Sequence, residues 1–336
     1  MKGLSLVILS RRLSARILYP GLAGVFFLLA IVTPAFSGEK LEVLVGSFGN
    51  NSVKSYLWPN GGYLGSLVPS NRGGLDGPSD LVLGPDGLLY VASSNNDSIK
   101  QYFTPNGGFI QNFVPARRGG LTDPQGLVFR LDGNLLVSSF ETDNVKLFKA
   151  ENGGYAEDFI RANAAGPRGP ADIILGPDGD VYVAWFDDDS VKRYDGETGV
   201  LVANFVRGGS GGLDGPRGLL FGPDGNLYVS SFNNDRVLRF DGEKGNFLGA
   251  LVPRNRGGLD GPWGLVTNPD GNLLVSSFNT SSILEYEFQK GGFLGAFVPA
   301  RSGDLFGPTA LIIVPEPATL LLFAAGGLLV VRRSRR

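Results

Sequence analysis

A short turn of sequence Pro-Asp-Gly recurs through the middle of the chain at a constant spacing. Each step is 46 residues, with no insertion or deletion, and the aspartates of the five copies are Asp86, Asp132, Asp178, Asp224 and Asp270. The second copy has Leu131 in place of proline, which leaves the period unchanged. A fixed period of this length indicates a repeat fold, in which each unit forms the same structure and packs on its neighbours.

One repeat, residues 215–253, contains four short apolar runs separated by turns. The runs are Gly218–Phe221, Leu227–Phe232, Arg236–Phe240 and Asn246–Val252. Asp-Gly and Gly residues between them supply the positive φ that tight turns between antiparallel strands require. Four antiparallel strands per repeat make one β-propeller blade. A β-solenoid is the alternative repeat fold, but its strands are parallel and its turns are shorter, so these turns favour the propeller.

The number of blades follows from the ends of the repeat. The second strand of the unit begins six times, at Val43, Leu89, Leu135, Val181, Leu227 and Leu273. The first strand also occurs six times, but the chain enters on a second strand and leaves on a first strand, Ala310–Val314. We therefore expect an all-β, six-bladed propeller over residues 38–314, with four antiparallel strands per blade. The C-terminal strand should complete the first blade and leave no open edge.

Residues 1–37 have the three parts of an export signal. A basic start precedes an apolar run over residues 21–32, and small residues before Gly38 provide a cleavage site. The basic residues are Lys2, Arg11, Arg12 and Arg16. Signal peptides have these parts in this order. The sequence predicts export, with an uncleaved membrane anchor as the alternative.

The other end, residues 315–336, also has three parts. Pro315, Glu316 and Pro317 precede the apolar run Ala318–Val331, and an Arg-rich cluster follows. A helix over that run would be about 21 Å long, which is short of the roughly 30 Å hydrocarbon core of a bilayer. Basic residues after such a span hold that end in the cytoplasm. An ordinary tail anchor is one interpretation of this pattern.

The three parts together resemble the PEP-CTERM sorting signal of Gram-negative bacteria. The resemblance implies recognition by an exosortase, attachment to the membrane through this segment before processing, and a final place in the cell envelope, at the cell surface or in the extracellular matrix. It also implies a setting of exopolysaccharide or biofilm production, with exopolysaccharide or a surface protein as a partner. We expect processing near Pro315–Pro317.

Residues 41–314 resemble NHL-type propeller repeats through the recurring pattern G-P-x-G-L-x-x-x-P-D-G-x-L-Y-V. The resemblance implies the propeller fold and says little about activity, because such propellers include scaffolds, binding modules and enzymes.

The residue types present restrict the chemistry. The chain has no cysteine and no histidine, so thiolate nucleophiles, imidazole metal ligands and Ser-His-Asp triads are excluded. Between the two end signals lie 22 basic and 31 acidic residues, a net charge of −9. An acidic body of this kind disfavours nucleic acid as a partner.

Three loops carry an arginine at the same repeat position, namely Arg72, Arg118 and Arg256. A partial ring of guanidinium groups would bind acidic sugars or carboxylates. The alternative is that these arginines pair with Asp76 and Asp260 and brace neighbouring blades.

The loops after the second strands are rich in Asn and Asp. Asp187, Asp188 and Asp189 form the best candidate for a bound cation, because their oxygens are ligands that Ca²⁺ prefers. Ca²⁺ is the only cofactor that the sequence suggests. Asn and Asp are also ordinary turn residues, which is the alternative explanation of their recurrence in nearly every blade.

Several residues break the repeat where the inner strands begin, and the inner strands of a propeller converge on its axis. Asp80 and Asp172 replace a small residue, and Arg217 and Trp263 occupy the preceding position in two adjacent blades. Trp185 replaces a recurring serine. Such departures either create ligand specificity or reflect drift. An arginine beside an aromatic ring is a common pairing for sugar-like ligands.

The leading hypothesis from sequence is an exported, non-enzymatic binding or structural propeller. The alternative is a metal-dependent lactonase or hydrolase of the gluconolactonase-like propeller type, whose metal is held by Glu, Asp and Asn at the channel mouth. Asp80 and Asp172 would begin such a site, but no Glu stands at the inner-strand entries to complete it.

Overall fold

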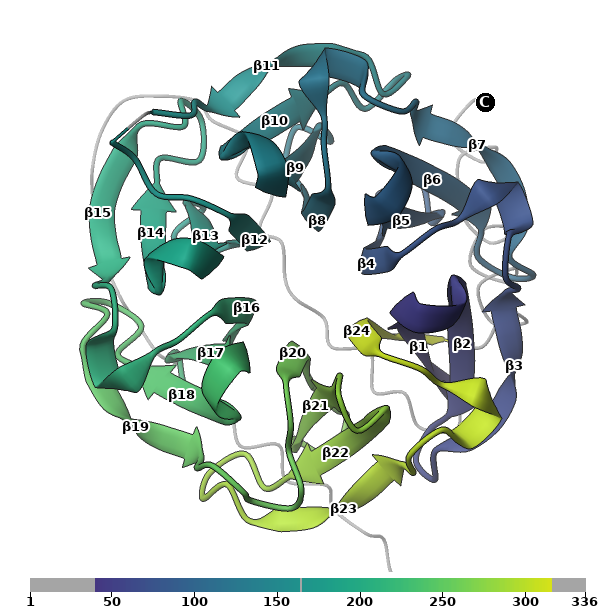
Figure 1. Ribbon diagram of the computed structural model, residues 1–336, viewed down its shortest axis with the longest axis vertical. Helices are drawn as coiled ribbons and strands as arrows, with labels where there is room; N and C mark the ends of the chain where they lie inside the picture. Colours follow the sequence, from purple (N-terminus) through teal and green to yellow (C-terminus); the bar gives the residue numbers. More distant parts are fainter. Residues whose placement is uncertain (1–39, 164, 316–336) are drawn as a thin grey trace, which may run out of the picture. The chain divides into compact units, whose positions relative to one another are not determined.

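A computed structural model describes residues 40–163 and 165–315. Six four-stranded antiparallel sheets surround a common axis (Figure 1). Blade 1 contains β24 (Pro308–Pro315), β1 (Leu41–Ser47), β2 (Ser52–Leu57) and β3 (Gly62–Val68). Blade 2 contains β4 (Pro78–Leu83), β5 (Leu89–Ser93), β6 (Ser98–Phe103) and β7 (Gly108–Val114). Blade 3 contains β8 (Pro124–Phe129), β9 (Leu135–Ser139), β10 (Asn144–Phe148) and β11 (Tyr155–Ile160).

The remaining blades repeat this order, with the first strand innermost. Blade 4 contains β12 (Pro170–Leu175), β13 (Val181–Trp185), β14 (Ser190–Tyr194) and β15 (Leu201–Val206). Blade 5 contains β16 (Pro216–Phe221), β17 (Leu227–Ser231), β18 (Arg236–Phe240) and β19 (Phe247–Val252). Blade 6 contains β20 (Pro262–Thr267), β21 (Leu273–Ser277), β22 (Ser282–Tyr286) and β23 (Phe293–Val298). The six-bladed all-β prediction is confirmed.

Short 3₁₀ turns occur only at one end of the blades in the described part of the chain. Those that link second and third strands are η1 (Phe48–Asn50), η3 (Ser94–Asn96), η5 (Phe140–Thr142), η6 (Phe186–Asp188) and η8 (Phe232–Asn234). Those between blades are η2 (Arg72–Gly74), η4 (Arg118–Gly120), η7 (Ser210–Gly212) and η9 (Ser302–Asp304). We call this end the loop face, and the opposite end, which carries the Pro-Asp-Gly turns, the turn face.

The ring closes between the two ends of the propeller. Strand β24 pairs antiparallel with β1, from Pro308 opposite Ser47 at the loop face to Pro315 opposite Leu41 at the turn face. The predicted closure is therefore confirmed, and β24 begins two residues before and ends one residue after the expected strand. Pro315, the first residue of the sorting box, belongs to this strand, whereas Glu316, Pro317 and the export signal lie outside the described residues.

Hydrophobic side chains fill the spaces between blades. All five residues of β5, β9, β13, β17 and β21 are buried. The outer strands are exposed or half-buried over most of their length and are buried only at their C-terminal ends. A typical cluster joins Tyr182 and Val191 of blade 4 to Leu219 and Val229 of blade 5. Burial of apolar area at every seam is the main source of stability in a fold whose blades are not linked by disulfides.

One hydrogen bond repeats at all six seams. The residue after each 3₁₀ or equivalent turn has φ between 48° and 61°, and its side-chain oxygen accepts the backbone N–H that precedes the next inner strand. The six acceptors are Asn51, Asp97, Asp143, Asp189, Asp235 and Ser281, at 2.7–3.3 Å from their donors. Asn and Asp tolerate this left-handed backbone better than most residues. Their recurrence in these loops therefore has a structural cause.

Candidate binding site

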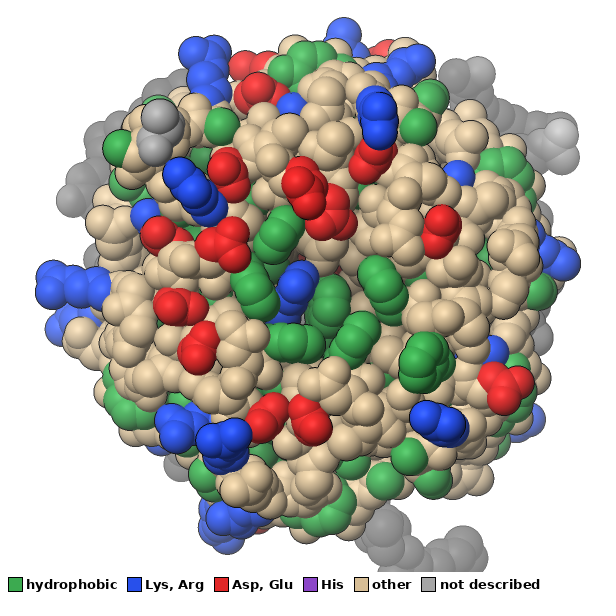
Figure 2. Space-filling model, viewed as in Figure 1, with side chains coloured by type: hydrophobic (Ala, Val, Ile, Leu, Met, Phe, Trp, Pro, Cys, Tyr) green, Lys and Arg blue, Asp and Glu red, His purple; other side chains and the backbone are tan. Residues whose placement is uncertain are grey.

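An aromatic collar surrounds the axis at the loop face. The residue that follows the second strand is phenylalanine in five blades, and neighbouring rings lie 6.0–6.4 Å apart. The collar consists of Phe48, Phe140, Phe186, Phe232 and Phe278. Blade 2 has Ser94 at this position, so the collar is interrupted there. Figure 2 shows hydrophobic side chains gathered around the centre of a face, with a basic group among them.

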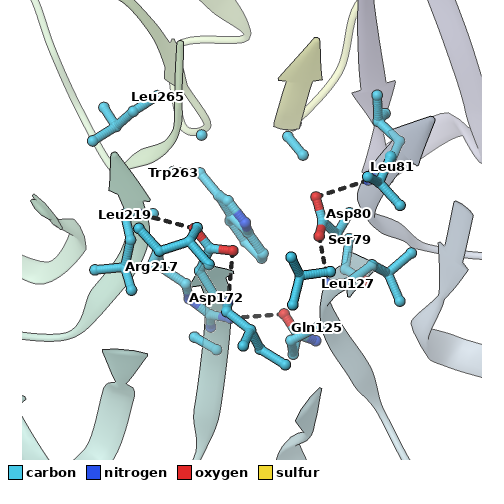
Figure 3. Close-up of a pocket in the computed structure, with 18 of the residues that line it drawn as sticks. Ser79, Asp80, Leu81, Gln125, Leu127, Asp172, Arg217, Leu219, Trp263 and Leu265 are labelled. Atoms are coloured by element: carbon cyan, nitrogen blue, oxygen red, sulfur yellow. Dashed lines mark hydrogen bonds between the residues drawn. The ribbon is translucent and has the colours of Figure 1, made fainter. Parts of the chain in front are cut away.

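Arg217 of β16 lies inside the collar. Its guanidinium carbon is 4.3 Å from the ring centroids of Phe186 and Trp263, and 5.5–5.6 Å from those of Phe140 and Phe232. One guanidinium nitrogen donates a 2.9 Å hydrogen bond to Gln125 Oε1 across the axis (Figure 3). Burial lowers the pKa of Arg217 to about 10, and the charges of Asp123 and Asp187 oppose that shift. The cation is held mainly by aromatic faces.

Trp263 is brought next to Arg217, as sequence position predicted, but it offers no free stacking surface. It stacks on Phe278 at 5.3 Å between centroids and 29° between planes, while Arg217 covers the ring as well. Together Arg217, Gln125 and Trp263 close the central channel. The predicted pairing of an arginine fork with an open aromatic platform is therefore replaced by an arginine packed on a covered ring.

A cavity of about 650 Å³ opens above this closure at the loop face. Arg217, Gln125 and Trp263 lie at its floor, and Ser94, Asn95, Thr122, Asp123 and Glu141 contribute polar wall. Two buried polar atoms of the lining, Thr122 Oγ1 and Arg217 Nε, have no hydrogen-bond partner among the described residues. Burial raises the pKa of the Asp123 carboxyl, although Gln125 donates a 2.6 Å hydrogen bond to it. The lining thus mixes apolar, cationic and anionic groups.

Below the closure, Asp80 and Asp172 face a narrower cavity of about 260 Å³ (Figure 3). Each carboxylate accepts the N–H of the next residue at 2.8 Å and an N–H of the following blade, Leu127 at 2.7 Å or Leu219 at 2.8 Å. Burial raises the pKa of Asp172 to about 6. Burial and the charge of Asp172 raise the pKa of Asp80 well above its ordinary value. Both aspartates connect blades as well as lining the channel.

Two other seams use a different connection. In blade 3, Ser138 Oγ accepts the N–H of Gly126 at 2.7 Å and donates to Ala171 O of blade 4 at 2.6 Å. Blade 5 uses Ser230 in the same way, with Gly218 as donor and Trp263 O as acceptor. In blades 2 and 4 the serine position holds Ala92 or Ala184. In these two blades, an aspartate on the inner strand and an alanine on the second strand therefore occupy the positions of the glycine and the serine.

Trp185 lies away from the axis cavities. Its side chain is buried in the cluster between blades 3 and 4, with Tyr194 at 6.4 Å between ring centroids. The recurring serine that it replaces bonds the loop before the inner strand elsewhere, as Ser231 does with the Asp214 N–H at 2.9 Å. Trp185 therefore exchanges a loop bond for apolar packing.

None of the three loop arginines lines either of the two cavities on the axis. The turns of Arg72 and Arg118 lie against β7 and β11, the outer strands of the next blades. The expected bracing by Asp76 and Asp260 is wrong, because those carboxylates accept hydrogen bonds from Asn95 and Asn279 at 2.9 and 2.7 Å. Within the described residues no ion pair joins them to Arg72 or Arg256. What repeats is a tyrosine hydroxyl bonded to the carbonyl at this position, as Tyr102 and Tyr286 show.

Asp187, Asp188 and Asp189 do not form a shared cation site. Asp188 pairs with Lys192 at 3.1 Å, and Asp189 accepts the Gly215 N–H of the next blade at 2.7 Å. No group of three or more acidic side chains in residues 40–163 and 165–315 is arranged to hold a metal ion. The structure therefore does not support a Ca²⁺ site at these residues. Asp189 instead makes the seam bond that all blades share.

Sequence reasoning missed the collar. The signal is present in the 46-residue alignment, in which phenylalanine follows Ser47, Ser139, Trp185, Ser231 and Ser277, while Ser94 follows Ser93. Phenylalanine at the end of an apolar strand is easily taken as part of the core. Only the ring geometry shows that these five positions meet around the axis.

Known proteins resemble this chain in two ways, through a sequence motif at the C-terminus and through the fold of the propeller. Residues 314–336 match the PEP-CTERM protein-sorting motif. The chain carries a PEP-CTERM sorting signal. This signal marks the propeller as an exported protein. No curated protein matches the chain. In the part of the chain that the structure describes, no helix is long and apolar enough to cross a membrane.

Solved structures of similar fold are distant in sequence. A chain of a nidogen/laminin complex matches with a TM-score of 0.64 and 14% identity, over 82% of this chain and 99% of that one. A streptogramin B lyase matches with a TM-score of 0.58 and 16% identity, over 80% and 82%. A catalytically inactive histidine-to-alanine variant of virginiamycin B lyase from Staphylococcus aureus, with quinupristin, matches at 0.58 and 12%, over 84% and 94%. These likenesses support the propeller fold alone.

Proposed function

We propose that this exported propeller is a non-enzymatic binding module that takes a small ligand in its loop-face cavity. The observation that carries the proposal is the guanidinium of Arg217, buried inside an aromatic collar at the floor of a cavity of about 650 Å³. A concave site with apolar walls and a few converging polar groups is typical of small-molecule sites. The side chains described offer no nucleophile–base pair there, and the chain has no histidine to supply one.

The place of action is part of the same proposal. Both Leu41 and Pro315 lie at the turn face, so the first and last strand ends of the described propeller are on the side opposite the cavity. An exosortase-type enzyme would process the chain near Pro315–Pro317, after a signal peptidase has cut near Gly38. The cavity would then open away from the membrane, at the cell surface or in the extracellular matrix, in an exopolysaccharide setting.

The metal-dependent lactonase is the weaker candidate. Asp80 and Asp172 share one cavity, which such an enzyme requires, but their oxygens already accept four backbone N–H bonds. In the described residues no third acidic side chain joins them. Elemental analysis of the purified propeller tests this candidate, and a stoichiometric divalent metal that Asp80→Asn and Asp172→Asn remove would favour it.

Replacing Arg217 tests the binding proposal. Arg217→Met keeps an unbranched apolar chain against the rings and removes the guanidinium, while Arg118→Met makes the same change at an exposed loop position. A thermal-shift screen of soluble small molecules should yield ligands that stabilise the wild type and Arg118→Met but not Arg217→Met. Ligands that stabilise all three proteins equally would show that the cavity is not the binding site.

A further inference from the structure

The interruption of the collar at Ser94 coincides with a second departure from the repeat in the next blade. At four seams a collar ring packs on the glycine before the next inner strand, where an added Cβ would lie only 2.8–3.1 Å from the ring. These pairs are Phe140–Gly169, Phe186–Gly215, Phe232–Gly261 and Phe278–Gly307. At the seam between blades 2 and 3 the same two positions hold Ser94 and Asp123, so a small side chain replaces the ring and a carboxylate replaces the hydrogen.

This double departure shapes the cavity. Ser94 and Asp123 both line it, beside Thr122 and Glu141 of blade 3 and Arg217 at the floor. Asp123 has φ of 46°, the backbone conformation that glycine has at the other seams, so the carboxylate is placed there despite a backbone cost. Phenylalanine at residue 94 would occupy this space, as its counterparts do elsewhere. The gap is therefore the side of the collar through which a ligand reaches Arg217.

The groups around the gap select the kind of ligand. Asp123 and Glu141 are acceptors, Arg217 and Thr122 provide donors, and Phe48 and Phe278 supply apolar wall. An inorganic anion would meet the two carboxylates, and a simple cation would meet Arg217. A hydroxyl group donates and accepts at once, so it satisfies both kinds of partner. A sugar ring combines several hydroxyls with apolar C–H faces that pack on aromatic side chains.

We propose that the gap between Ser94 and Asp123 admits a neutral saccharide unit, whose hydroxyls bond Asp123, Thr122 and Arg217 while its C–H face packs against the collar. The proposal rests on the proposed binding function and names its ligand class. The unpaired Thr122 Oγ1 and Arg217 Nε are independent support, since buried polar atoms without partners are rare. A bound saccharide supplies hydroxyl partners at this position.

The test uses three variants of the mature propeller. Ser94→Phe with Asp123→Gly reproduces the arrangement of the other seams and closes the gap. Ser94→Ala keeps the gap open and is the matched control. Thr122→Val removes the unpaired hydroxyl at constant shape, so its melting temperature should stay equal or rise while affinity falls roughly 2- to 10-fold.

The probes are neutral disaccharides (maltose, cellobiose and N,N′-diacetylchitobiose), digalacturonate, and a panel of free amino acids, measured by isothermal titration calorimetry. We expect the wild type to bind at least one neutral disaccharide, Ser94→Ala to bind it within about 2-fold because only one hydroxyl of the wall is lost, and the double variant to lose at least 10-fold. Equal binding by the double variant would overturn the gap as the entry.

The remaining outcomes separate this inference from the proposed function. Binding of digalacturonate or amino acids alone, lost in the double variant, would refute the neutral saccharide and leave the cavity as a binding site. If no probe bound to the wild type, while circular dichroism showed the folded propeller, both proposals would fall.

Discussion

The Asp80 carboxylate of β4 accepts the backbone N–H of Leu127 in β8 at 2.7 Å, and so joins the inner strands of two neighbouring blades. The equivalent bond in blade 4 runs from Leu219 N–H to Asp172. Both aspartates occur with alanine on the neighbouring strand, at Ala92 and Ala184. The channel carboxylates therefore have a structural task that does not depend on any ligand.

The pairing of Asp80 with Ala92 predicts that a substitution at residue 92 can compensate for the loss of Asp80. Asp80→Gly should lower the free energy of unfolding by about 1–3 kcal/mol, because the buried Leu127 N–H loses its acceptor. Adding Ala92→Ser should recover most of that loss. The new hydroxyl would accept the backbone N–H of residue 80 and donate to Gln125 O, as Ser138 does one blade later with its own neighbours. Urea unfolding of both single variants and the double variant measures the coupling. Additive effects would contradict the exchange of one seam connection for another.

The same aspartates predict an unusual pH dependence. The folded-state pKa of Asp172 is raised to about 6, above the value of roughly 3.9 in an unfolded chain. Folding therefore takes up protons, so this contribution to stability is complete below about pH 4 and is lost as pH rises through about 6. Asp172→Asn removes the titration. We expect the stability of the wild type relative to Asp172→Asn to fall by about 1–3 kcal/mol between pH 4.5 and 7.5.

The control for this measurement is Asp270→Asn, a change at an exposed Pro-Asp-Gly turn. The stability of the wild type relative to this control should change much less over the same range. A flat difference for Asp172→Asn would show that the channel carboxylates titrate as exposed groups do.

The fold was predictable from sequence because the repeat is exact. Five Asp-Gly turns at one spacing and a chain that starts and ends out of phase determine six blades and their closure. The entry residues Asp80, Asp172, Arg217 and Trp263 were also placed correctly at the axis, since all inner strands converge there. Periodicity gives the position of a residue along its blade and therefore its distance from the axis.

What periodicity could not give was how side chains from different blades meet. Arg217 contacts Phe140, Phe186 and Phe232, which come from three second-strand ends, and its bond to Gln125 joins blade 5 to blade 3. Trp185 occupies a conspicuous position in the repeat but is buried between blades. Such contacts depend on the rotation between blades, which the sequence pattern of a single blade does not contain.

The seam bond of Asp189 predicts that replacing this residue with asparagine or with alanine will affect stability differently. Asp189→Asn should be nearly neutral, because Asn51 makes the same bond in blade 1. Asp189→Ala should cost about 1–3 kcal/mol, since the Gly215 N–H loses its acceptor and alanine is less favourable at positive φ. Thermal unfolding with 1 mM Ca²⁺ and with EDTA checks the cause. Equal loss in both variants, or stabilisation by Ca²⁺ that Asp189→Asn abolishes, would instead favour a cation site.

The closing strand predicts a sharp limit for truncation. A chain that ends at Gly307 lacks all of β24, the inner strand of blade 1. It would expose the edge of β1 and remove Leu311 and Val314 from the clusters on both sides of the blade. A single missing inner strand therefore weakens two seams, and we expect the truncated propeller to lose its cooperative unfolding transition or to aggregate through the open edge.

The matched control ends at Pro315, which pairs with Leu41 and completes the strand without the apolar tail. This form should fold, remain monomeric in size-exclusion chromatography and melt in one transition. Adding a separate peptide of residues 308–315 to the shorter chain should restore part of that transition, because the strand supplies backbone hydrogen bonds to β1 together with apolar side chains. A Gly307 truncation that melts like the Pro315 form would show that blade 1 is stable with three strands, so that β24 contributes little to closing the ring.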